Sequence, residues 1–377
     1  MYFDIAFQGG EMIGQWIGKY SGDVVGGIIL YIEKNDSGCE VLAYICPQKS
    51  EIPSSIAYFS AESLANNNTY LADVSPIDPR NYNIVPWESI KNLYDKDISH
   101  SKKADVSMII DGDRMKISAK TDIDVNLTAE LSLQKVTEKS LIQSSEMSWE
   151  QYKRHVSEIL DDQMVFRGQK QPWPLQTSFH RRGRYRTDLF ISKDIPILHQ
   201  RLCSITSHYF NLDDPKQNGA FFNLLQHHGY PTPLLDWSYS PFVAAFFAFR
   251  EWVKGHENND ECIRIYIFNN KLWRQRLSQI NYLNPPFPHL SATDFAAINN
   301  PRVIPQQALT TVTNVVNIEA YILSVEKSNG VKFLHAIDIP VKYRDEAMRE
   351  LRYMGITAGS MFPGIDGVCE EMKDRFF

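Results

Sequence analysis

The chain has 377 residues, of which 43% are hydrophobic and 22% are charged, and its formal net charge is −6. This length predicts two domains, and the composition excludes a collagen-like, coiled-coil or wholly disordered protein. The negative net charge argues against a global electrostatic grip on nucleic acid, although it leaves room for a local basic patch.

The cysteine spacing and the hydropathy of the chain indicate the cellular compartment that we expect. The five cysteines are scattered, and no two of them have the Cys-x-x-Cys spacing of a zinc site. We therefore expect reduced thiols and no metal. The chain begins without a basic leader followed by an apolar stretch, and it contains no run of about 18–20 apolar residues, so we expect no secretory signal, no membrane span and a cytoplasmic location.

Residues 1–135 have the pattern of antiparallel β-structure. Residues 28–32 and 41–46 are apolar and β-branched, and Asp111-Gly112 is a hairpin turn signal. Apolar and polar side chains alternate along residues 122–133, which places one face on a core and the other in water. The prediction is a β-sandwich or barrel that senses or targets and that offers a surface to a regulatory partner, with residues 67–96 as a long loop or short helix.

A polar segment, residues 136–147, is the predicted linker. Ser148 and Gln151 then have the spacing of a capping box at the start of a helix. Strand and helix patterns alternate from there to the end, with a long helix expected over 189–210 and a buried helix after Ser240-Pro241. The predicted fold is α+β, with an antiparallel β domain at 1–135 and a second domain at 148–377.

In two segments of the second domain, side chains that form hydrogen bonds lie between apolar residues. One is Val165-Phe166-Arg167-Gly168-Gln169, and the other, residues 226–238, contains Pro-Thr-Pro-Leu-Leu-Asp-Trp. Burying a guanidinium or a carboxylate costs roughly 1–3 kcal/mol for each group left without a partner. Such residues therefore serve a site more often than a surface.

Together these segments resemble the signature motifs of the FRG domain family, which is named for its Phe-Arg-Gly sequence. Residues 300–309, with Arg302 and the pair Gln306-Gln307, are similar to the third motif of that family. The resemblance covers about 148–377. The chain departs from the family pattern at Pro233, Ala308 and Thr310, which affects the fine shape of the site.

The order of these motifs also resembles an ADP-ribosyltransferase core, which implies an NAD-using transferase or NAD glycohydrolase with NAD as its substrate. Family association adds a bacterial toxin or phage-defence effector that acts on a protein or nucleic-acid acceptor. The residues implied as catalytic are Arg167, Asp236, Gln306 and Gln307. The residues implied in cofactor binding are Arg167, Gly168, Gln169, His227, Thr232, Asp236 and Ser238.

Elementary chemistry supports some of these roles and opposes one. Arg167 offers a planar fork for a pyrophosphate, and Gly168 would let a ligand approach the backbone. The transferase plan places a Glu where this chain has Gln306 and Gln307, and a neutral amide cannot stabilise a cationic transition state. Either Asp236 or Glu319 could supply that carboxylate instead.

Two alternatives remain open from the sequence. The first is a non-catalytic FRG module whose pocket, with Arg167 and Asp236, binds a nucleotide or nucleic acid; a plainer alternative is that these two residues form only a buried structural salt bridge. The second concerns the basic run at residues 180–186, which is either a solvated loop or a patch that holds phosphates. The residues of that patch are Arg181, Arg182, Arg184 and Arg186.

Overall fold

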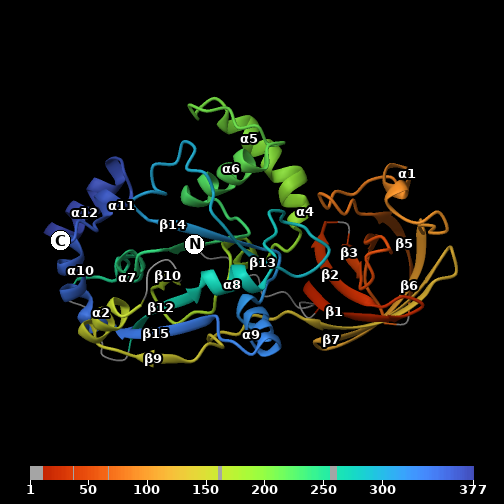
Figure 1. Ribbon diagram of the computed structural model, residues 1–377, viewed down its shortest axis with the longest axis horizontal. Helices are drawn as coiled ribbons and strands as arrows, with labels where there is room; N and C mark the ends of the chain where they lie inside the picture. The colour runs from red at the N-terminus through yellow and green to blue at the C-terminus, as the bar shows by residue number, and fades with distance from the viewer. Residues whose placement is uncertain (1–11, 37, 67, 160–163, 255–260) are drawn as a thin grey trace.

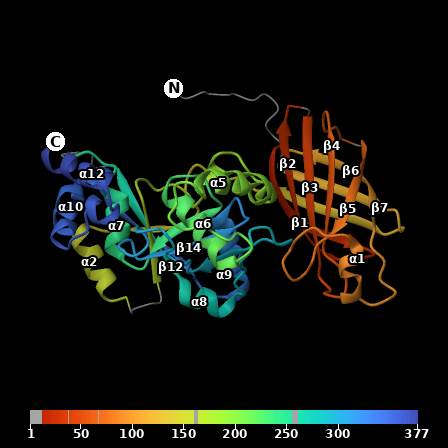
Figure 2. The ribbon, with the colours of Figure 1, turned by 90° about the horizontal axis from the view of Figure 1, so that it is seen from above.

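The computed structural model describes residues 12–36, 38–66, 68–159, 164–254 and 261–377. Figures 1 and 2 show an elongated molecule with a β-barrel at one end and a larger α+β region beside it. The helices nearest the C-terminus, α10, α11 and α12, lie at the end farthest from the barrel. Among the described residues, no helix combines the length and the apolar character needed to cross a bilayer.

Eight antiparallel strands close the barrel, because β1 pairs with both β2 and β8. The strands are β1 (Gly14–Gly22), β2 (Gly26–Asn35), β3 (Gly38–Pro47), β4 (Ser55–Ala61), β5 (Thr69–Pro76), β6 (Lys103–Asp111), β7 (Arg114–Thr121) and β8 (Asn126–Leu133). The predicted antiparallel β domain is confirmed, and it is a barrel. The predicted turn at Asp111-Gly112 joins β6 to β7, with Gly112 at φ +56°.

The segment 67–96 is only partly the loop that was expected. It contains β5 as well as the short helix α1 (Trp87–Ile90). The prolines of this segment, Pro76, Pro79 and Pro86, dominated the expectation, yet β5 reaches Pro76 before the loop begins. The prediction of a long loop or short helix is therefore wrong for residues 69–76, which form β5, while the short helix is present as α1.

Strands β2 and β3 are buried on both of their faces. Ile28 and Leu30 face the barrel interior, whereas Ile29 and Tyr31 belong to a separate buried cluster outside it. That second cluster includes Tyr185 of the α+β region, so the outer wall of these strands packs against the rest of the molecule. This double burial explains why β2 is apolar at consecutive positions, while β7 and β8 alternate.

The α+β region is built around a seven-stranded sheet with the order β13-β14-β11-β10-β12-β15-β9. Its strands are β9 (Ser144–Glu146), β10 (Met164–Gln169), β11 (Leu234–Ser238), β12 (Cys262–Asn269), β13 (Leu290–Thr293), β14 (Ala308–Thr313) and β15 (Leu334–Pro340). The pair β9–β15 is parallel, and the other neighbouring pairs are antiparallel.

Helices flank this sheet on both faces (Figure 1). They are α2 (Trp149–Ser157), α3 (Ser178–Arg181), α4 (Thr187–Leu189), α5 (Ile195–Leu202), α6 (Pro215–His227), α7 (Pro241–Phe249), α8 (Asn270–Arg276), α9 (Ile318–Asn329), α10 (Arg344–Tyr353), α11 (Ala358–Met361) and α12 (Ile365–Phe376). The predicted capping box at Ser148 and the predicted Ser240 cap of the buried helix α7 are both present. The single long helix expected over 189–210 is instead divided, because α4 and α5 are joined by a π-helical turn at 190–194 and the helix ends at Leu202.

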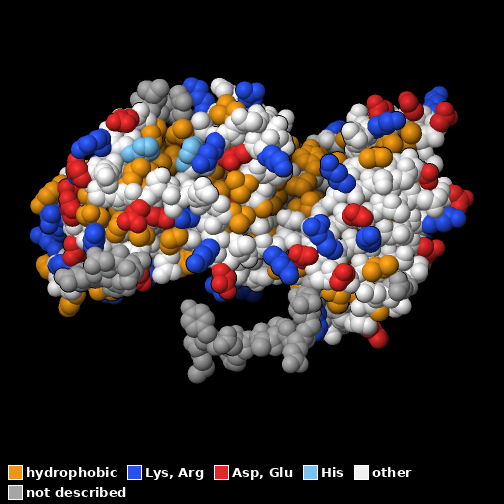
Figure 3. Space-filling model, turned by 90° about the horizontal axis from the view of Figure 1, so that it is seen from below, with side chains coloured by type: hydrophobic (Ala, Val, Ile, Leu, Met, Phe, Trp, Pro, Cys, Tyr) orange, Lys and Arg blue, Asp and Glu red, His pale blue; other side chains and the backbone are white. Residues whose placement is uncertain are grey.

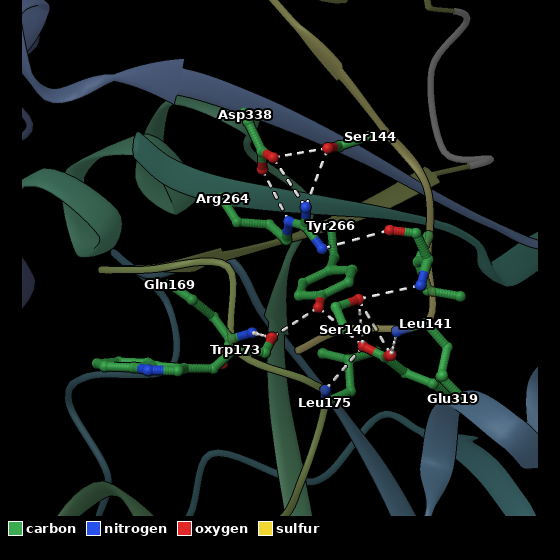
Figure 4. Close-up of polar contacts among 11 residues, drawn as sticks. Ser140, Leu141, Ser144, Gln169, Trp173, Leu175, Arg264, Tyr266, Glu319 and Asp338 are labelled. Atoms are coloured by element: carbon green, nitrogen blue, oxygen red, sulfur yellow. Dashed lines mark hydrogen bonds and ion pairs between the residues drawn. The ribbon is translucent and has the colours of Figure 1, made fainter. Parts of the chain in front are cut away.

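The predicted linker, residues 136–147, is built into the α+β region. Its strand β9 pairs with β15, and the Arg264 guanidinium donates to Ser144 and to both oxygens of Asp338. The buried Glu319 carboxylate accepts hydrogen bonds from the Ser140 hydroxyl and from the backbone N–H of Leu141 (Figure 4). These contacts hold the segment at the edge of the sheet.

Candidate functional site

The two signature segments meet at neighbouring strands of the sheet. Arg167 on β10 and Asp236 on β11 line one pocket with a volume of about 340 Å³. Strands β10 and β11 share the single register pair Phe166 and Ser238, so they separate beyond it. The Arg167 guanidinium donates from Nη1 to the Asp236 carbonyl oxygen at 2.7 Å, which spans the opening between the strands.

Arg167 is a buried cation in this pocket. Burial lowers its pKa to about 10, against the opposing effect of the nearby Asp236 charge, so the guanidinium stays protonated at neutral pH. Its Nε is buried and has no hydrogen-bond partner among the described residues. An unsatisfied buried donor is costly, so this N–H is available to a bound acceptor.

Asp236 is held by a short relay of side chains. The Thr232 hydroxyl donates to Gln226 Oε1, and Gln226 Nε2 donates to Asp236 Oδ2 at 3.0 Å. Thr232 is fully buried and does not line the pocket, so its role is to fix the orientation of the Gln226 amide. The other carboxylate oxygen, Asp236 Oδ1, is buried and has no partner among the described residues.

A second network of hydrogen-bonded side chains connects α6 with the segment around Asn300 and reaches the pocket at His227. Asn300 Nδ2 lies 2.8 Å from Asn223 Oδ1 and 2.9 Å from His227 Nδ1, and Asn223 in turn donates to Thr310. His227 Nδ1 also lies 3.2 Å from Asn300 Oδ1, and its Nε2 is buried without a partner among the described residues. His227 therefore brings an unpaired ring nitrogen to the pocket that it lines.

The two glutamines of the third motif differ in position. Gln306 is buried, lines the pocket and donates from Nε2 to the Met361 carbonyl oxygen. Gln307 has φ +47°, and its side chain is exposed and away from the pocket lining. Ser238 lines the pocket too, although its hydroxyl already donates to the Gln306 carbonyl oxygen and accepts from the Ser240 N–H.

Gly168 and Gln169 have structural reasons for their identity. A Cβ on Gly168 would lie 1.8 Å from the Ala244 carbonyl oxygen, so glycine lets β10 pack directly against α7. Gln169 is buried and donates to the Trp173 carbonyl oxygen. Gly168 therefore serves close packing of two elements, and both Gly168 and Gln169 also line the pocket.

The charge around the pocket is mainly positive. Besides Arg167, its lining contains Lys170, Arg181 and Arg302, against the carboxylates of Asp236 and Glu251. The Arg302 guanidinium lies 5.4 Å from the Phe362 ring centre and donates to the His227 carbonyl oxygen. A basic pocket of this size suits an anionic ligand such as a phosphate-bearing one.

Aromatic side chains supply the walls. Phe247 and Phe362 meet edge to face with ring centres 5.8 Å apart, and both line the pocket together with the exposed Trp173. Trp237 also lines the pocket, but its ring is buried against Phe268 and its N–H is donated to Thr311. Phe247, Phe362 and Trp173 were not predicted as site residues, because none of them belongs to the signature segments.

The basic run at 180–186 is dispersed in the structure. Arg181 lines the pocket and Arg182 is exposed, whereas Arg184 pairs with Asp194 and lies over the Phe179 ring. Arg186 is buried and pairs with Asp188 and with Glu40 of the barrel. On the face drawn in Figure 3, basic side chains are interspersed with acidic ones.

Glu319 lies outside the pocket, so it does not supply the carboxylate that the transferase plan requires there. Its oxygens accept from Leu141 N–H at 2.6 Å and Leu175 N–H at 2.9 Å, and the Tyr266 hydroxyl lies 2.8 Å away (Figure 4). The same hydroxyl lies 2.7 Å from the Trp173 carbonyl oxygen, so Glu319 supports the segment that carries Trp173. Within the described part of the chain, no group of three or more His, Cys, Asp or Glu is placed to hold a metal ion.

Comparison with known families decides the nature of this region. Residues 162–257 match the model of the FRG domain. The chain contains an FRG domain. The matched span includes β10, α6, β11 and α7, and therefore Arg167, Gln226 and Asp236, while Gln306 lies beyond it.

Other comparisons add little to this. No curated protein matches the chain. Among solved structures, the redesigned β-barrel mFAP1 bound to DFHBI is 10% identical, covers 32% of this chain and 94% of its own, and has a TM-score of 0.22. Rv2717c from M. tuberculosis is 11% identical, covers 33% and 94% respectively, and has a TM-score of 0.19. Likenesses at this level carry no information on function.

Proposed function

We propose that the FRG pocket binds NAD and that the chain releases nicotinamide from it, as an ADP-ribosyltransferase or an NAD glycohydrolase. The observation that supports this is a pairing of unsatisfied groups. Arg167 Nε and Asp236 Oδ1 are both buried without partners among the residues that the structure describes, and both residues line the same pocket. An anionic oxygen of a ligand would accept a hydrogen bond from Arg167 Nε. A hydroxyl group or a positive charge on the same ligand would satisfy Asp236 Oδ1.

The pocket divides into parts that suit NAD. Arg167, Arg302 and Lys170 supply positive charge for the pyrophosphate. Phe247 and Phe362 supply apolar walls for the nicotinamide ring. Asp236, oriented by Gln226, supplies negative charge for the ribose as its glycosidic bond breaks.

The chemistry balances without a further reagent. The bond between ribose C1′ and the nicotinamide nitrogen breaks, and nicotinamide leaves with the bonding electron pair. The ribose becomes an oxocarbenium ion, and the Asp236 carboxylate stabilises its charge. Water or an acceptor nucleophile then forms the new bond at C1′ and loses a proton.

A second candidate function is a nucleotide-binding module without catalysis. Gln306 favours this second function. It brings a neutral amide to the pocket, whereas the ADP-ribosyltransferase motif order that the chain resembles has a catalytic Glu at the corresponding point of the sequence. The roles of toxin or phage-defence effector and a protein or nucleic-acid acceptor remain proposals that rest on family association. The cytoplasmic location is also a proposal, and it rests on the cysteine usage and hydropathy of the sequence.

Nicotinamide release from NAD distinguishes the two candidates. We expect the wild-type chain to release nicotinamide, as measured by chromatography. Asp236→Asn keeps the size of the side chain and an acceptor for Gln226 while removing the charge, so it should lower the rate about 100-fold or more. Arg167→Lys should weaken NAD binding, because lysine lacks the planar fork. Asp366→Asn, on an exposed residue of α12, is the matched control and should leave the rate unchanged.

Three other outcomes have defined meanings. If wild-type protein releases no nicotinamide, but NAD or ADP-ribose raises its melting temperature and Arg167→Lys abolishes that rise, the chain is a binder. If Asp236→Asn reacts as fast as wild type, the proposed role of Asp236 is wrong. If NAD causes neither turnover nor stabilisation, both functions are rejected.

A further inference from the structure

The barrel encloses a second cavity, far in sequence from the FRG motifs. Its volume is about 400 Å³, and it opens between residues 97–101, residues 52–53 and residues 121–125. An eight-stranded barrel is just wide enough to be filled by its own side chains or to hold one small molecule. The side chains that face inward decide between these outcomes.

Side-chain size differs between the two ends of this barrel. The end near the start of β1 is filled by large residues, including Trp16, Met108, Met115 and Leu131. The lining of the open end combines larger apolar side chains such as Phe59 and Ile117 with six alanines, which are Ala43, Ala57, Ala72, Ala104, Ala119 and Ala129. Ala43 is paired with Ala57 and Ala72 with Ala104 across neighbouring strands, so these small side chains leave space inside the barrel.

One polar group in this apolar chamber has no partner. Tyr20 is 3% exposed and lines the cavity, and its hydroxyl is buried without a hydrogen-bond partner among the described residues. Burial raises the pKa of Tyr20 above its ordinary value, so the hydroxyl remains a donor at neutral pH. A buried hydroxyl left unpaired costs roughly 1–3 kcal/mol, which a ligand acceptor would offset.

The charges of the lining exclude an anionic ligand. Among the described residues that line the cavity there is no Lys or Arg, and the acidic one is Asp97 at the opening. His100 lies at the same opening, 2.9 Å from the Ser55 hydroxyl, and burial lowers its pKa. It is therefore neutral at pH 7 and does not attract a carboxylate.

We propose that the barrel binds a neutral, apolar small molecule whose hydrogen-bond acceptor, such as a carbonyl oxygen, meets the Tyr20 hydroxyl. The size follows from volume, since an apolar cavity of about 150 Å³ holds one benzene ring. A cavity of about 400 Å³ then takes on the order of a dozen carbon atoms. This site is independent of the NAD pocket, and either proposal can fail alone.

Binding of prodan tests the proposal on the full chain. Prodan is a neutral aromatic ketone whose fluorescence shifts to the blue in apolar surroundings. We expect saturable binding, displaced by 2-dodecanone and not by dodecanoate. The double variant Ala104→Leu/Ala129→Leu fills the cavity and should weaken binding at least tenfold, whereas Ala65→Leu makes the same change at an exposed position and should leave binding unchanged.

The variant Tyr20→Phe provides a second test in case the double variant Ala104→Leu/Ala129→Leu does not fold. It removes only the hydroxyl, so the barrel should fold as before, and prodan binding should weaken about three- to tenfold. Prodan binding that is absent in wild type, or equal in wild type and in the folded filled variant, overturns the proposal. Displacement by dodecanoate as efficient as by 2-dodecanone overturns the assignment of a neutral ligand.

Discussion

Two histidines of the α+β region are buried as neutral groups. His180 and His289 are 2% and 4% exposed, and burial lowers the pKa of each to about 3. Each ring has one nitrogen near a hydroxyl, Thr177 for His180 and Ser291 for His289, and an Nε2 without a partner among the described residues. Protonation of either ring would place an uncompensated charge in the interior.

This burial predicts a loss of stability in mild acid. An unfolded histidine has a pKa near 6.5, so between about pH 3 and 6.5 the unfolded chain binds more protons than the folded one. The free energy of unfolding should therefore fall with falling pH, by about 1.4 kcal/mol per pH unit for each histidine. Urea unfolding of wild type, His180→Gln and His289→Gln between pH 5 and 6 measures this. Each variant should show a shallower slope, and a slope equal to wild type would contradict the assignment.

Individual site residues could be predicted only where a local motif carries them. Arg167 and Asp236 were identified from their motifs, and the structure places both in one pocket. The roles of Gln306 and Gln307 could not be separated, because a positive φ at Gln307 sends adjacent side chains to different surroundings. Phe362 was not predicted as a site residue, since its place in the pocket depends on the packing of the C-terminal region against Phe247 of α7 and against Gln306.

The contact between β10 and α7 is the tightest constraint at the level of elements. Gly168 has no side chain, and the Ala244 carbonyl oxygen and the Ala248 side chain occupy the space beside it. Helix α7 is apolar on nearly every side and lies in the interior, so it cannot move outward without opening the main core. The position of Arg167, one residue earlier, depends on the same contact.

Gly168→Ala should therefore destabilise the chain and disturb the pocket. The new Cβ would lie 1.8 Å from the Ala244 carbonyl oxygen, and overpacking of this kind costs about 1–3 kcal/mol or more. Gly27→Ala is the matched control, because Gly27 also lies in a strand and its added Cβ would meet no atom within 4 Å. Thermal unfolding of both variants checks this. A Gly168→Ala protein as stable as Gly27→Ala would show that α7 can shift.

At this scale, periodic elements could be predicted and aperiodic ones could not. Strand β8 and the buried helix α7 were visible in their hydrophobic patterns and caps. Strand β9 consists of Ser-Ser-Glu and carries no pattern, since backbone pairing with β15 and the Arg264 contacts hold it. The break between α4 and α5 was missed because apolar periodicity continues through the π-helical turn.

Gln15 joins the two parts of the molecule. It is fully buried, and its Nε2 donates to the Asn314 carbonyl oxygen at 2.6 Å while its Oε1 accepts from the Val316 N–H at 3.0 Å. A side chain of the barrel thus satisfies two backbone groups of the α+β region. Glu33 adds a similar link, because its carboxylate accepts from the N–H groups of Tyr185 and Arg186.

Removal of the Gln15 amide should weaken the joint between the two parts. Gln15→Leu leaves two buried backbone groups unpaired, at about 1–3 kcal/mol each. Scanning calorimetry should show a lower melting temperature and a broadening or splitting of the transition, since the barrel and the α+β region would then unfold less cooperatively. Gln48→Leu, on an exposed residue of the same barrel, should behave as wild type. A Gln15→Leu transition identical to that of Gln48→Leu would mean that the joint contributes little.

The double burial of β2 and β3 has a consequence for dissection of the gene. A fragment that ends at residue 135 would lose the packing of Tyr185 against the cluster that contains Ile29, Tyr31 and Leu42, and apolar surface exposed in this way promotes self-association. A gene fusion that joined either part to a different domain would need that domain to cover the same apolar surface. The barrel and the α+β region should therefore be expressed together, because each covers apolar surface of the other.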